Sequence, residues 1–173
     1  MPKIVDHDQY RRELAQKAVA LFSEHGYRGL GMRRIAEELG LSKSALYHYF
    51  PSKEALFAAC TDEVTRFEPS GTEDGALADL MRTFESLEPG MVGELSLLLD
   101  YLRGKSPTEV AEDPTMRLAN RRYRERVAAA VGEANATPVL CLLLGTLLQR
   151  WLDGGTTSFD EIERWLNEHL VEK

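Results

Sequence analysis

Hydrogen-bond donors gather in one short stretch of the chain, GLSKSALYHYF, at residues 40–50. Ser44, Tyr47 and His48 are spaced i, i+3 and i+4, so a helix places them on one stripe, with Lys43 beside it. Side chains of these types can bond to base edges and to phosphate oxygens. The pattern therefore favours the chemistry of DNA recognition in the major groove.

The same stretch carries an apolar stripe. Leu46, Tyr49 and Phe50 also have the i, i+3, i+4 spacing and are expected to face the preceding helices. Tyr49 lies on the border between the stripes, so its ring can pack inward while its hydroxyl reaches a phosphate. The alternative is a plain three-helix domain whose polar face is only solvated.

A tight turn precedes this helix and weighs against that alternative. Ala36 is small enough for two helices to cross closely, and Gly40 can adopt the left-handed conformation that a three- or four-residue turn requires. Leu41 is expected to fill the space between the helices, and Ser42 to cap the second helix. These features predict a helix–turn–helix at about residues 31–50.

Enzymatic chemistry has no comparable support in the sequence. There is no glycine-rich phosphate loop, no nucleophile motif and no His, Cys or carboxylate spacing typical of a metal site, and the four histidines are scattered. Cys60 and Cys141 each stand alone in apolar helical patterns, as small buried hydrophobes do. We therefore expect no catalytic residue, no metal and no cofactor.

The charge of the chain is divided unevenly along its length. Residues 1–56 hold nine Lys and Arg against seven Asp and Glu, a net +2, and residues 57–173 hold twelve against twenty-one, a net −9. Together they give the overall charge of −7. A basic head on an acidic body is consistent with one surface that faces phosphate and another that faces a different partner.

Helical patterns fill the chain, and no alternating apolar run indicates a strand. The sequence predicts an all-α fold of about nine helices: an N-terminal three-helix domain with the helix–turn–helix, and a C-terminal helical domain. Residues 69–75, PSGTEDG, have the composition of a linker. Beyond it, we expect helices over residues 76–88, 91–104, 113–134, 138–153 and 159–171.

No segment of the sequence favours secretion or membrane insertion. The first residues, MPKIVD, lack the apolar core of a secretion signal. The longest apolar run extends from Val139 to Leu148 with one interruption, well short of the roughly 18–20 residues that a membrane span needs. We expect a soluble, cytoplasmic protein with no membrane partner.

The segment GMRRIAEELGLSKSALYHYFPSKEALF, residues 31–57, closely resembles the DNA-binding domain of TetR-family transcriptional regulators. The upstream AVALFSEHGYRGL resembles the first helix of that family, so the resemblance covers roughly residues 8–68. It implies a DNA-binding domain at residues 1–52, extending to about 68 with a connecting helix. Residues 53–173 would then bind an effector and dimerise, although residues 76–173 resemble the family only in helix number and in the LDGG before the last helix.

The resemblance implies a set of DNA contacts on the chain. Tyr47 and Lys53 would hold backbone phosphates, together with Arg33 at the start of the second helix, and Lys43 is the best candidate to read a guanine edge. The family often has Thr where Gly31 stands, so the phosphate contact of that side chain is missing here. The complete expected set is Arg33, Ser42, Lys43, Ser44, Tyr47, His48, Tyr49 and Lys53.

A homodimer is expected because one short recognition helix reads too few bases. The segment PVLCLLLGTLLQRWL is apolar nearly all round, and the last helix has one apolar stripe, so the resemblance implies an intermolecular four-helix bundle. The alternative is that these residues form an intramolecular core. The expected dimer interface is Leu140, Leu143, Leu144, Leu147, Trp151, Phe159, Ile162, Trp165, Leu166 and Leu170.

The middle helices would enclose the pocket of an unknown small-molecule effector in the resembling fold. The pocket candidates are Phe67, Leu80, Met81, Phe84, Met91, Leu95, Leu98, Tyr101, Leu102 and Tyr123. Aromatic residues and methionines at helical spacing are also typical of a plain core. The basic run from Arg117 to Arg126 is interpreted as a solvated helix face with salt bridges to the acidic surroundings, with a pocket for an anionic effector as its alternative.

These observations together predict a ligand-responsive regulator that binds double-stranded operator DNA with a pseudo-palindromic sequence. Repression, relieved by the effector, is the usual outcome in the resembling family. The alternative is a helix–turn–helix protein that acts as a protein-interaction module.

Overall fold

The computed structural model describes residues 6–66 and 75–170. The predicted linker, except Gly75, lies outside these residues, as do Phe67 and Val171. The described chain forms two compact units. Within the described residues, unit 1 consists of residues 6–66 and 92–119. Unit 2 consists of residues 75–91 and 120–170.

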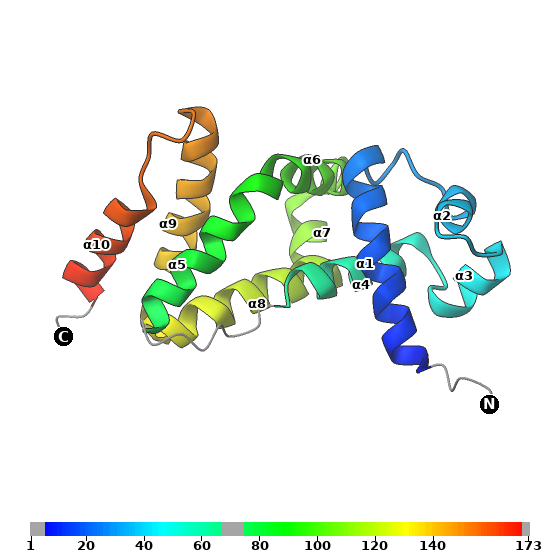
Figure 1. Ribbon diagram of the computed structural model, residues 1–173, viewed down its shortest axis with the longest axis horizontal. Coiled ribbons are helices and arrows are strands. Elements are labelled where there is room, and N and C mark those ends of the chain that lie inside the picture. Colours follow the sequence, from blue (N-terminus) through cyan, green and yellow to red (C-terminus); the bar gives the residue numbers. More distant parts are fainter. Residues whose placement is uncertain (1–5, 67–74, 171–173) are drawn as a thin grey trace. The chain divides into compact units, whose positions relative to one another are not determined.

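Unit 1 begins with four helices: α1 (His7–His25), α2 (Met32–Glu38), α3 (Lys43–Tyr49) and α4 (Lys53–Val64). Figure 1 shows α1 lying across α4, with α2 and α3 beside them. The unit also contains most of α6 (Met91–Leu102), α7 (Pro107–Glu112) and the start of α8 (Pro114–Val131).

The core of unit 1 follows the apolar spacing of α1. Leu14, Ala18 and Phe22 recur every four residues and are fully buried. They pack with Leu56 and Phe57 of α4 and with side chains of α2, α3 and α6 in one apolar cluster. Burial of each large apolar side chain contributes about 1.5–3 kcal/mol, so this cluster is what holds α2 and α3 in place.

The turn between α2 and α3 has the predicted geometry. Gly40 has φ 70°, its N–H donates to Glu37 O at 3.1 Å, and the N–H of Leu41 donates to Ala36 O at 2.8 Å. These two bonds form a Schellman motif, which requires a left-handed residue at the position of Gly40. Ser42 Oγ then accepts from Ala45 N at 3.1 Å and caps α3, as expected.

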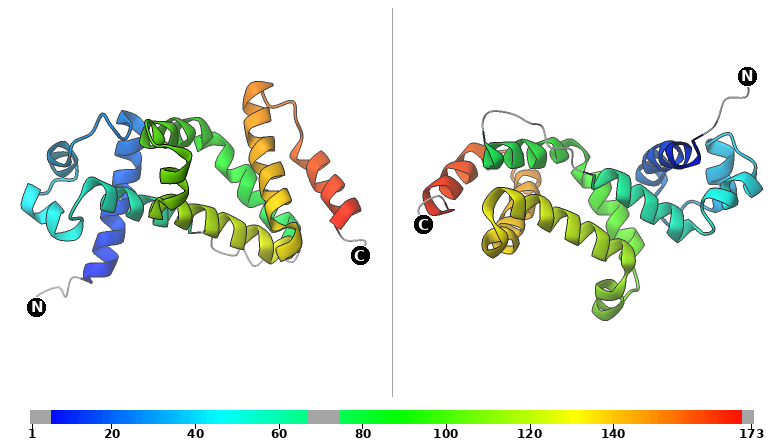
Figure 2. Two further views of the ribbon diagram at one scale, coloured as in Figure 1. Left: turned by 180° about the vertical axis from the view of Figure 1, so that it is seen from behind. Right: turned by 90° about the horizontal axis from the view of Figure 1, so that it is seen from below.

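Unit 2 contains α5 (Ala76–Leu87), a 3₁₀ turn (Glu88–Gly90), the rest of α8, α9 (Glu133–Leu152) and α10 (Phe159–Leu170). Its core joins α5, α8, α9 and α10 through Phe84, Val127, Leu143 and Leu166, all fully buried. Figure 2 shows α5, α9 and α10 side by side from behind and from below.

A short loop orients α10. Both oxygens of Asp153 accept hydrogen bonds from this loop, including one of 2.5 Å from the Thr157 hydroxyl. These bonds, led by the one from Thr157, lower the pKa of Asp153 to about 2. Arg150 braces the same loop through Thr157 O and also bonds Glu88 Oε1 at 2.9 Å.

The described residues confirm an all-α fold close to the predicted helix number, with ten α-helices and one 3₁₀ turn. The helix expected from 113 to 134 ends earlier, because Gly132 adopts φ 79°. The next helix therefore begins at Glu133 and includes Pro138, which was predicted to start it. α7 was missed: its Ser106 and Glu109 form a capping box between the predicted helices 91–104 and 113–134.

Within the described ranges, no single helix is long and apolar enough to cross a membrane. Only the pair Pro114–Val131 and Glu133–Leu152, taken together, meets that length and composition, and the pair is bent by 115° at its break.

Candidate functional site

The two stripes of α3 separate as the sequence predicted. Leu46 and Phe50 are fully buried in the unit 1 core. On the other side, Ser44, Tyr47 and His48 are exposed, with 40% of Tyr47 accessible. α3 therefore presents a row of donors that its own fold does not cover.

Lys43 and Arg33 extend this row at the start of α3 and of α2. Both are exposed, and Lys43 Nζ lies 5.7 Å from the centre of the Tyr47 ring. Arg33 Nε donates to Glu37 Oε1 at 2.9 Å, an exposed i, i+4 pair that a phosphate can replace at small cost. A hollow of about 450 Å³ lies between the two helices and is lined by Arg33, Ala36, Glu37, Leu41, Ser42 and Lys43.

Lys53 has partners inside the protein that the sequence did not indicate. Its ammonium donates to Tyr27 O at 3.1 Å and to Leu30 O at 3.0 Å, and lies 4.3 Å from the centre of the Tyr27 ring. Two of its three N–H donors are therefore used to fix the loop before α2. The predicted phosphate contact would use the third.

Tyr49 is half-buried, and its ring packs edge-on against Tyr10 at 5.4 Å between centroids. Its hydroxyl lies 3.2 Å from Nδ1 of His7, the first residue of α1. Arg11 also reaches this helix end, donating to Tyr49 O at 3.4 Å and lying over the Phe50 ring. Sequence reasoning missed His7 and Arg11, because their contacts with Tyr49 join residues 42 and 38 positions apart.

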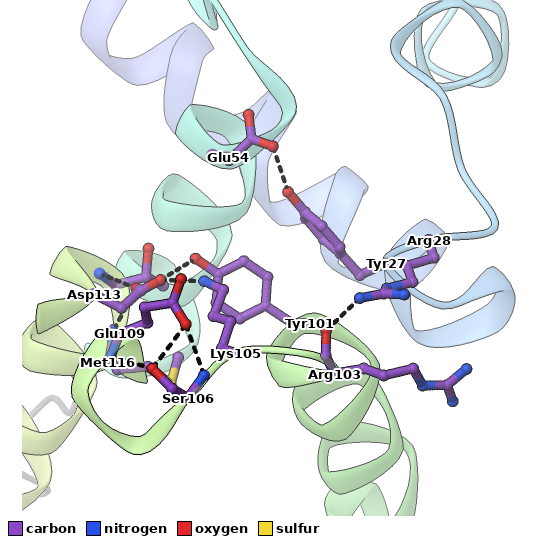
Figure 3. Close-up of polar contacts among 11 residues, drawn as sticks. Tyr27, Arg28, Glu54, Tyr101, Arg103, Lys105, Ser106, Glu109, Asp113 and Met116 are labelled. Atoms are coloured by element: carbon purple, nitrogen blue, oxygen red, sulfur yellow. Dashed lines mark hydrogen bonds and ion pairs between the residues drawn. The ribbon is translucent and has the colours of Figure 1, made fainter. Parts of the chain in front are cut away.

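A polar network ties the end of α6 to the loop before α2 (Figure 3). The backbone N–H of Arg28 donates to Asp100 Oδ2 at 2.7 Å, and its guanidinium donates to Arg103 O. Tyr27 and Tyr101 meet edge-on, 4.9 Å apart. Burial, followed by the hydrogen bond to Glu54, raises the pKa of Tyr27, so this ring stays neutral.

Asp113 anchors the other side of this network. Its Oδ2 accepts from Tyr101 Oη at 2.7 Å and from Lys105 Nζ at 2.5 Å, and its Oδ1 accepts from Thr115 N and Met116 N. Burial alone would raise the pKa of Asp113, but the bonds from Lys105 and Tyr101 outweigh it and lower that pKa. The carboxylate thereby holds α6 and the first turn of α8 together.

Unit 1 also contains a cavity of about 140 Å³. Its wall is mostly apolar and includes Glu94, the one carboxylate among the described lining residues; Glu94 is partly exposed, and desolvation raises its pKa. Cys60 is buried in the wall and donates to Ala15 O, and burial raises the pKa of its thiol to about 12. The lining residues are Val19, Phe22, Ser23, Phe57, Cys60, Thr61, Val64, Glu94, Leu97, Leu98, Met116 and Ala119.

The predicted pocket residues are distributed over both units. Of the nine that lie in the described residues, only Leu98 lines this cavity. Tyr101 and Leu102 pack in or against the unit 1 core, and Leu95 is half-buried on α6. In unit 2, the apolar cluster takes up Leu80, Met81, Phe84, Met91 and Tyr123. Phe67 lies outside the described residues.

The predicted dimer residues separate into two groups. Leu143, Leu147, Phe159 and Leu166 are buried in the core of unit 2, in line with the intramolecular alternative, and Leu140, Ile162 and Leu170 pack against them. The exposed group contains Leu144, Trp151 and Trp165, which are 46%, 53% and 49% accessible. Leu148 and Leu152 are exposed on α9 as well, so an apolar strip runs along that helix.

The basic run on α8 has intramolecular partners. Arg117 donates to Ala111 O at 2.8 Å, and Arg124 pairs with Glu133 at 2.6 Å. Arg126 is mostly buried and pairs with Asp79 at 2.5 Å. Arg122 also has a partner, and Arg121 is exposed. Across the part of the chain that the structure describes, no group of His, Cys, Asp and Glu could hold a metal ion.

Comparison with known proteins supports the resemblance of this chain to the TetR family. Residues 14–60 match the family described as bacterial regulatory proteins, tetR family. The HTH-type transcriptional repressor Rv1474c of Mycobacterium tuberculosis is 30% identical over 168 residues, which cover 89% of each chain. The chain belongs to the TetR family of bacterial transcriptional regulators. Its members are not enzymes, which confirms that part of the prediction.

Other TetR relatives match over different lengths. The regulator PksA of Bacillus subtilis is 36% identical over 81 residues, which cover 47% of this chain and only 40% of PksA. A solved TetR regulator from Rhodococcus sp. RHA1 has a TM-score of 0.61 at 23% identity, over 96% of this chain and 98% of that one. The match with PksA covers about two fifths of the length of PksA. The match with the Rhodococcus structure supports the fold.

Proposed function

We propose that this TetR-family chain is a ligand-responsive regulator that binds operator DNA as a homodimer and represses transcription until a small effector releases it. The observation that carries the proposal is the donor row of α3, held outward by the burial of Leu46 and Phe50. A helix presented in this way through a tight turn can enter the major groove.

Recognition of the DNA base sequence and binding to the DNA phosphates can be tested separately. We expect Lys43→Ala to change which base is preferred at one position of each half-site, and Tyr47→Phe to weaken binding to all sequences by removing one hydroxyl donor. The assay is fluorescence anisotropy with duplexes selected from a random library by the unmodified chain. Lys17→Ala, an exposed lysine in the middle of α1, is the control. Unchanged specificity and affinity in both variants would exclude the docking of α3.

A second copy of the chain is the proposed partner of the apolar strip on α9. Exposed leucines and tryptophans at i, i+3 and i+4 spacing are what a helix-to-helix interface needs. We expect Leu148→Glu to shift the chain toward monomer in light scattering, whereas Glu163→Gln on α10 leaves the mass unchanged. A wild-type monomer at micromolar concentration would contradict the dimer.

The cavity in unit 1 is the proposed effector site. Its volume of about 140 Å³ is close to that of the engineered cavity of roughly 150 Å³ that binds benzene. A single ring with a cationic or donor group fits best, because among the described residues the lining contains the carboxylate of Glu94 and no lysine or arginine.

Three probes with the same ring and different charge test this site: benzylamine, benzyl alcohol and benzoate. We expect thermal stabilisation to be largest with benzylamine and smallest with benzoate, and Ala119→Leu, which fills the cavity, to abolish all three shifts. Glu94→Gln should remove the preference for the amine but leave binding of the ring. Equal shifts in the wild-type and Ala119→Leu chains would place binding elsewhere.

A further inference from the structure

The start of α1 and the last turn of α3 form one polar aromatic cluster, made of His7, His48 and Tyr49. The His7 ring lies 6.1 Å from that of Tyr49 and 6.4 Å from that of His48, and the rings of His48 and Tyr49 are 5.2 Å apart. Both imidazoles are exposed, and Tyr49 is half-buried. His48 belongs to the donor row of α3, whereas His7 is the first residue of α1 and lies outside the helix–turn–helix.

The contact between His7 Nδ1 and Tyr49 Oη, 3.2 Å long, has two possible directions. If Nδ1 has no proton, the Tyr49 hydroxyl donates its only hydrogen to His7. It can then only accept a hydrogen bond from any further partner. If Nδ1 carries a proton, as it does in the charged ring and in one neutral tautomer, Nδ1–H must donate and Oη must accept, which frees the hydroxyl hydrogen. The charged ring also brings a positive charge toward phosphate. A phosphate oxygen only accepts, so Tyr49 can bond to phosphate without losing this contact when Nδ1 is protonated.

We propose that His7 is part of the DNA-contacting surface and that operator binding takes up a proton at the His7–His48–Tyr49 cluster. The proposal rests on the proposed function. It makes His7 a positioning residue that directs the Tyr49 hydroxyl toward phosphate, and a cation that faces the DNA backbone.

The sign of the effect follows from the charge of DNA. Phosphates near an imidazole favour its charged form, so the complex binds more protons than the free protein. Affinity therefore rises as pH falls through the range of about pH 8 to 6 in which histidines exchange protons. Each proton taken up changes the affinity by at most about tenfold per pH unit.

The other charged groups on α1 and α3 do not account for the proposed dependence of DNA affinity on pH. The charged side chains along this part of α1 and α3 are two carboxylates and three cations, at Asp6, Asp8, Arg11, Arg12 and Lys43. The carboxylate of Asp6 caps α1 by accepting from Asp8 N and Gln9 N. The phenols of Tyr10 and Tyr47 are the other ionisable side chains on this part of the two helices. The proposal therefore assigns the proton to the imidazoles of His7 and His48.

The test measures DNA affinity against pH with the full-length chain. The probe is a fluorescent duplex of about 30 base pairs, long enough for two half-sites one helical turn apart, recovered from a random library by the wild-type chain. We expect wild-type affinity to increase several-fold from pH 8 to pH 6 at constant ionic strength. His7→Gln should retain a side-chain donor for Tyr49 and lose part of the pH slope, by up to one proton. His25→Gln, at the other end of α1, is the matched control.

A double-mutant cycle isolates the hydroxyl. In a Tyr49→Phe chain, His7→Gln should change affinity at pH 6 less than it does in the wild type, because the hydroxyl it directs is gone. The inference is overturned if His7→Gln leaves the pH slope unchanged, or if His25→Gln reduces it equally. A wild-type chain that selects no DNA at any pH would instead refute the proposed function.

Discussion

Removal of the Asp113 carboxylate tests how much the hydrogen bonds beside the cavity stabilise unit 1. Asp113 is 8% exposed and accepts four hydrogen bonds, two from side chains and two from the first turn of α8. One of the backbone donors is Met116, which lines the cavity. The substitutions to compare are Asp113→Ala and Asp113→Asn.

The cost of Asp113→Ala can be assembled from its contacts. Loss of the cap on α8 costs about 0.5–2 kcal/mol. The buried Tyr101 hydroxyl loses its acceptor, at about 1–3 kcal/mol. Lys105 is partly exposed, so water compensates most of its loss. We expect a decrease of about 2–4 kcal/mol in the free energy of unfolding, which lowers Tm by roughly 5–15 °C in a chain of this size.

Asp113→Asn separates charge from shape. The amide keeps an oxygen for the cap but loses the charge that pairs with Lys105, so about 1–2 kcal/mol should be lost. The folded-state pKa of Asp113 is lowered, so the charge stabilises the fold above the ordinary carboxyl pKa of about 4, and this contribution disappears as pH falls through the lowered value. The gap between wild type and Asp113→Asn should therefore be full at pH 7 and shrink below about pH 4.

Urea and thermal unfolding followed by circular dichroism, at one protein concentration, measure these differences. Asp160→Ala, an exposed aspartate on α10, is the control and should change stability by less than about 0.5 kcal/mol. If Asp113→Ala matched this control, the four hydrogen bonds would not support the fold and the network in Figure 3 would not anchor α6.

Two further predictions concern Lys53 and the cysteines. Lys53→Met should lower the free energy of unfolding by about 1–3 kcal/mol, because it removes the bonds to Tyr27 O and Leu30 O, and an unchanged urea midpoint would contradict this. Cys141 is exposed, although its apolar context predicted burial. In the Leu148→Glu chain, in which the proposed α9 interface is disrupted, Cys60 should react with a disulfide reagent at pH 8 far more slowly than Cys141, since Cys60 is buried and its thiol pKa is raised to about 12. Equal reaction rates of the two thiols in that chain would contradict the burial of Cys60.

The turn of the helix–turn–helix could be predicted because local backbone geometry selects its residues. Only a residue that tolerates positive φ can occupy the position of Gly40, and only a side chain with an oxygen can cap α3 as Ser42 does. The two stripes of α3 are local in the same sense, since helical spacing alone separates Leu46 from Tyr47.

The covered faces of α9 could not be predicted in this way. Its sequence is apolar nearly all round, so spacing does not tell which leucines face the interior of unit 2. The structure buries Leu143 completely and leaves its neighbour Leu144 46% exposed. Which leucine is buried depends on packing partners from α5 and α10. These partners are distant in sequence, so the local spacing of apolar residues does not predict them.

The cavity depends on similar long-range pairing. Val19 and Phe22 of α1 face residues of α6 and α8 there, so the wall combines segments about 75 to 100 positions apart. The sequence indicated apolar helical residues in the middle of the chain but not which of them a void would leave unpacked. His7 was missed for the same reason, because only the folded chain brings it to Tyr49.

Under the proposed function, α6 connects the proposed effector cavity with the proposed DNA-contacting surface. Leu97 and Leu98 line the cavity, and the residues that follow bond to Arg28 and pack on Tyr27. A shift from 1:99 to 99:1 between two states needs about 5.5 kcal/mol of differential binding. A ring of six to eight heavy atoms supplies at most about 9–12 kcal/mol in total. About half of its binding free energy must therefore discriminate between the states, so the cavity has to be nearly closed to the ligand when the protein holds DNA.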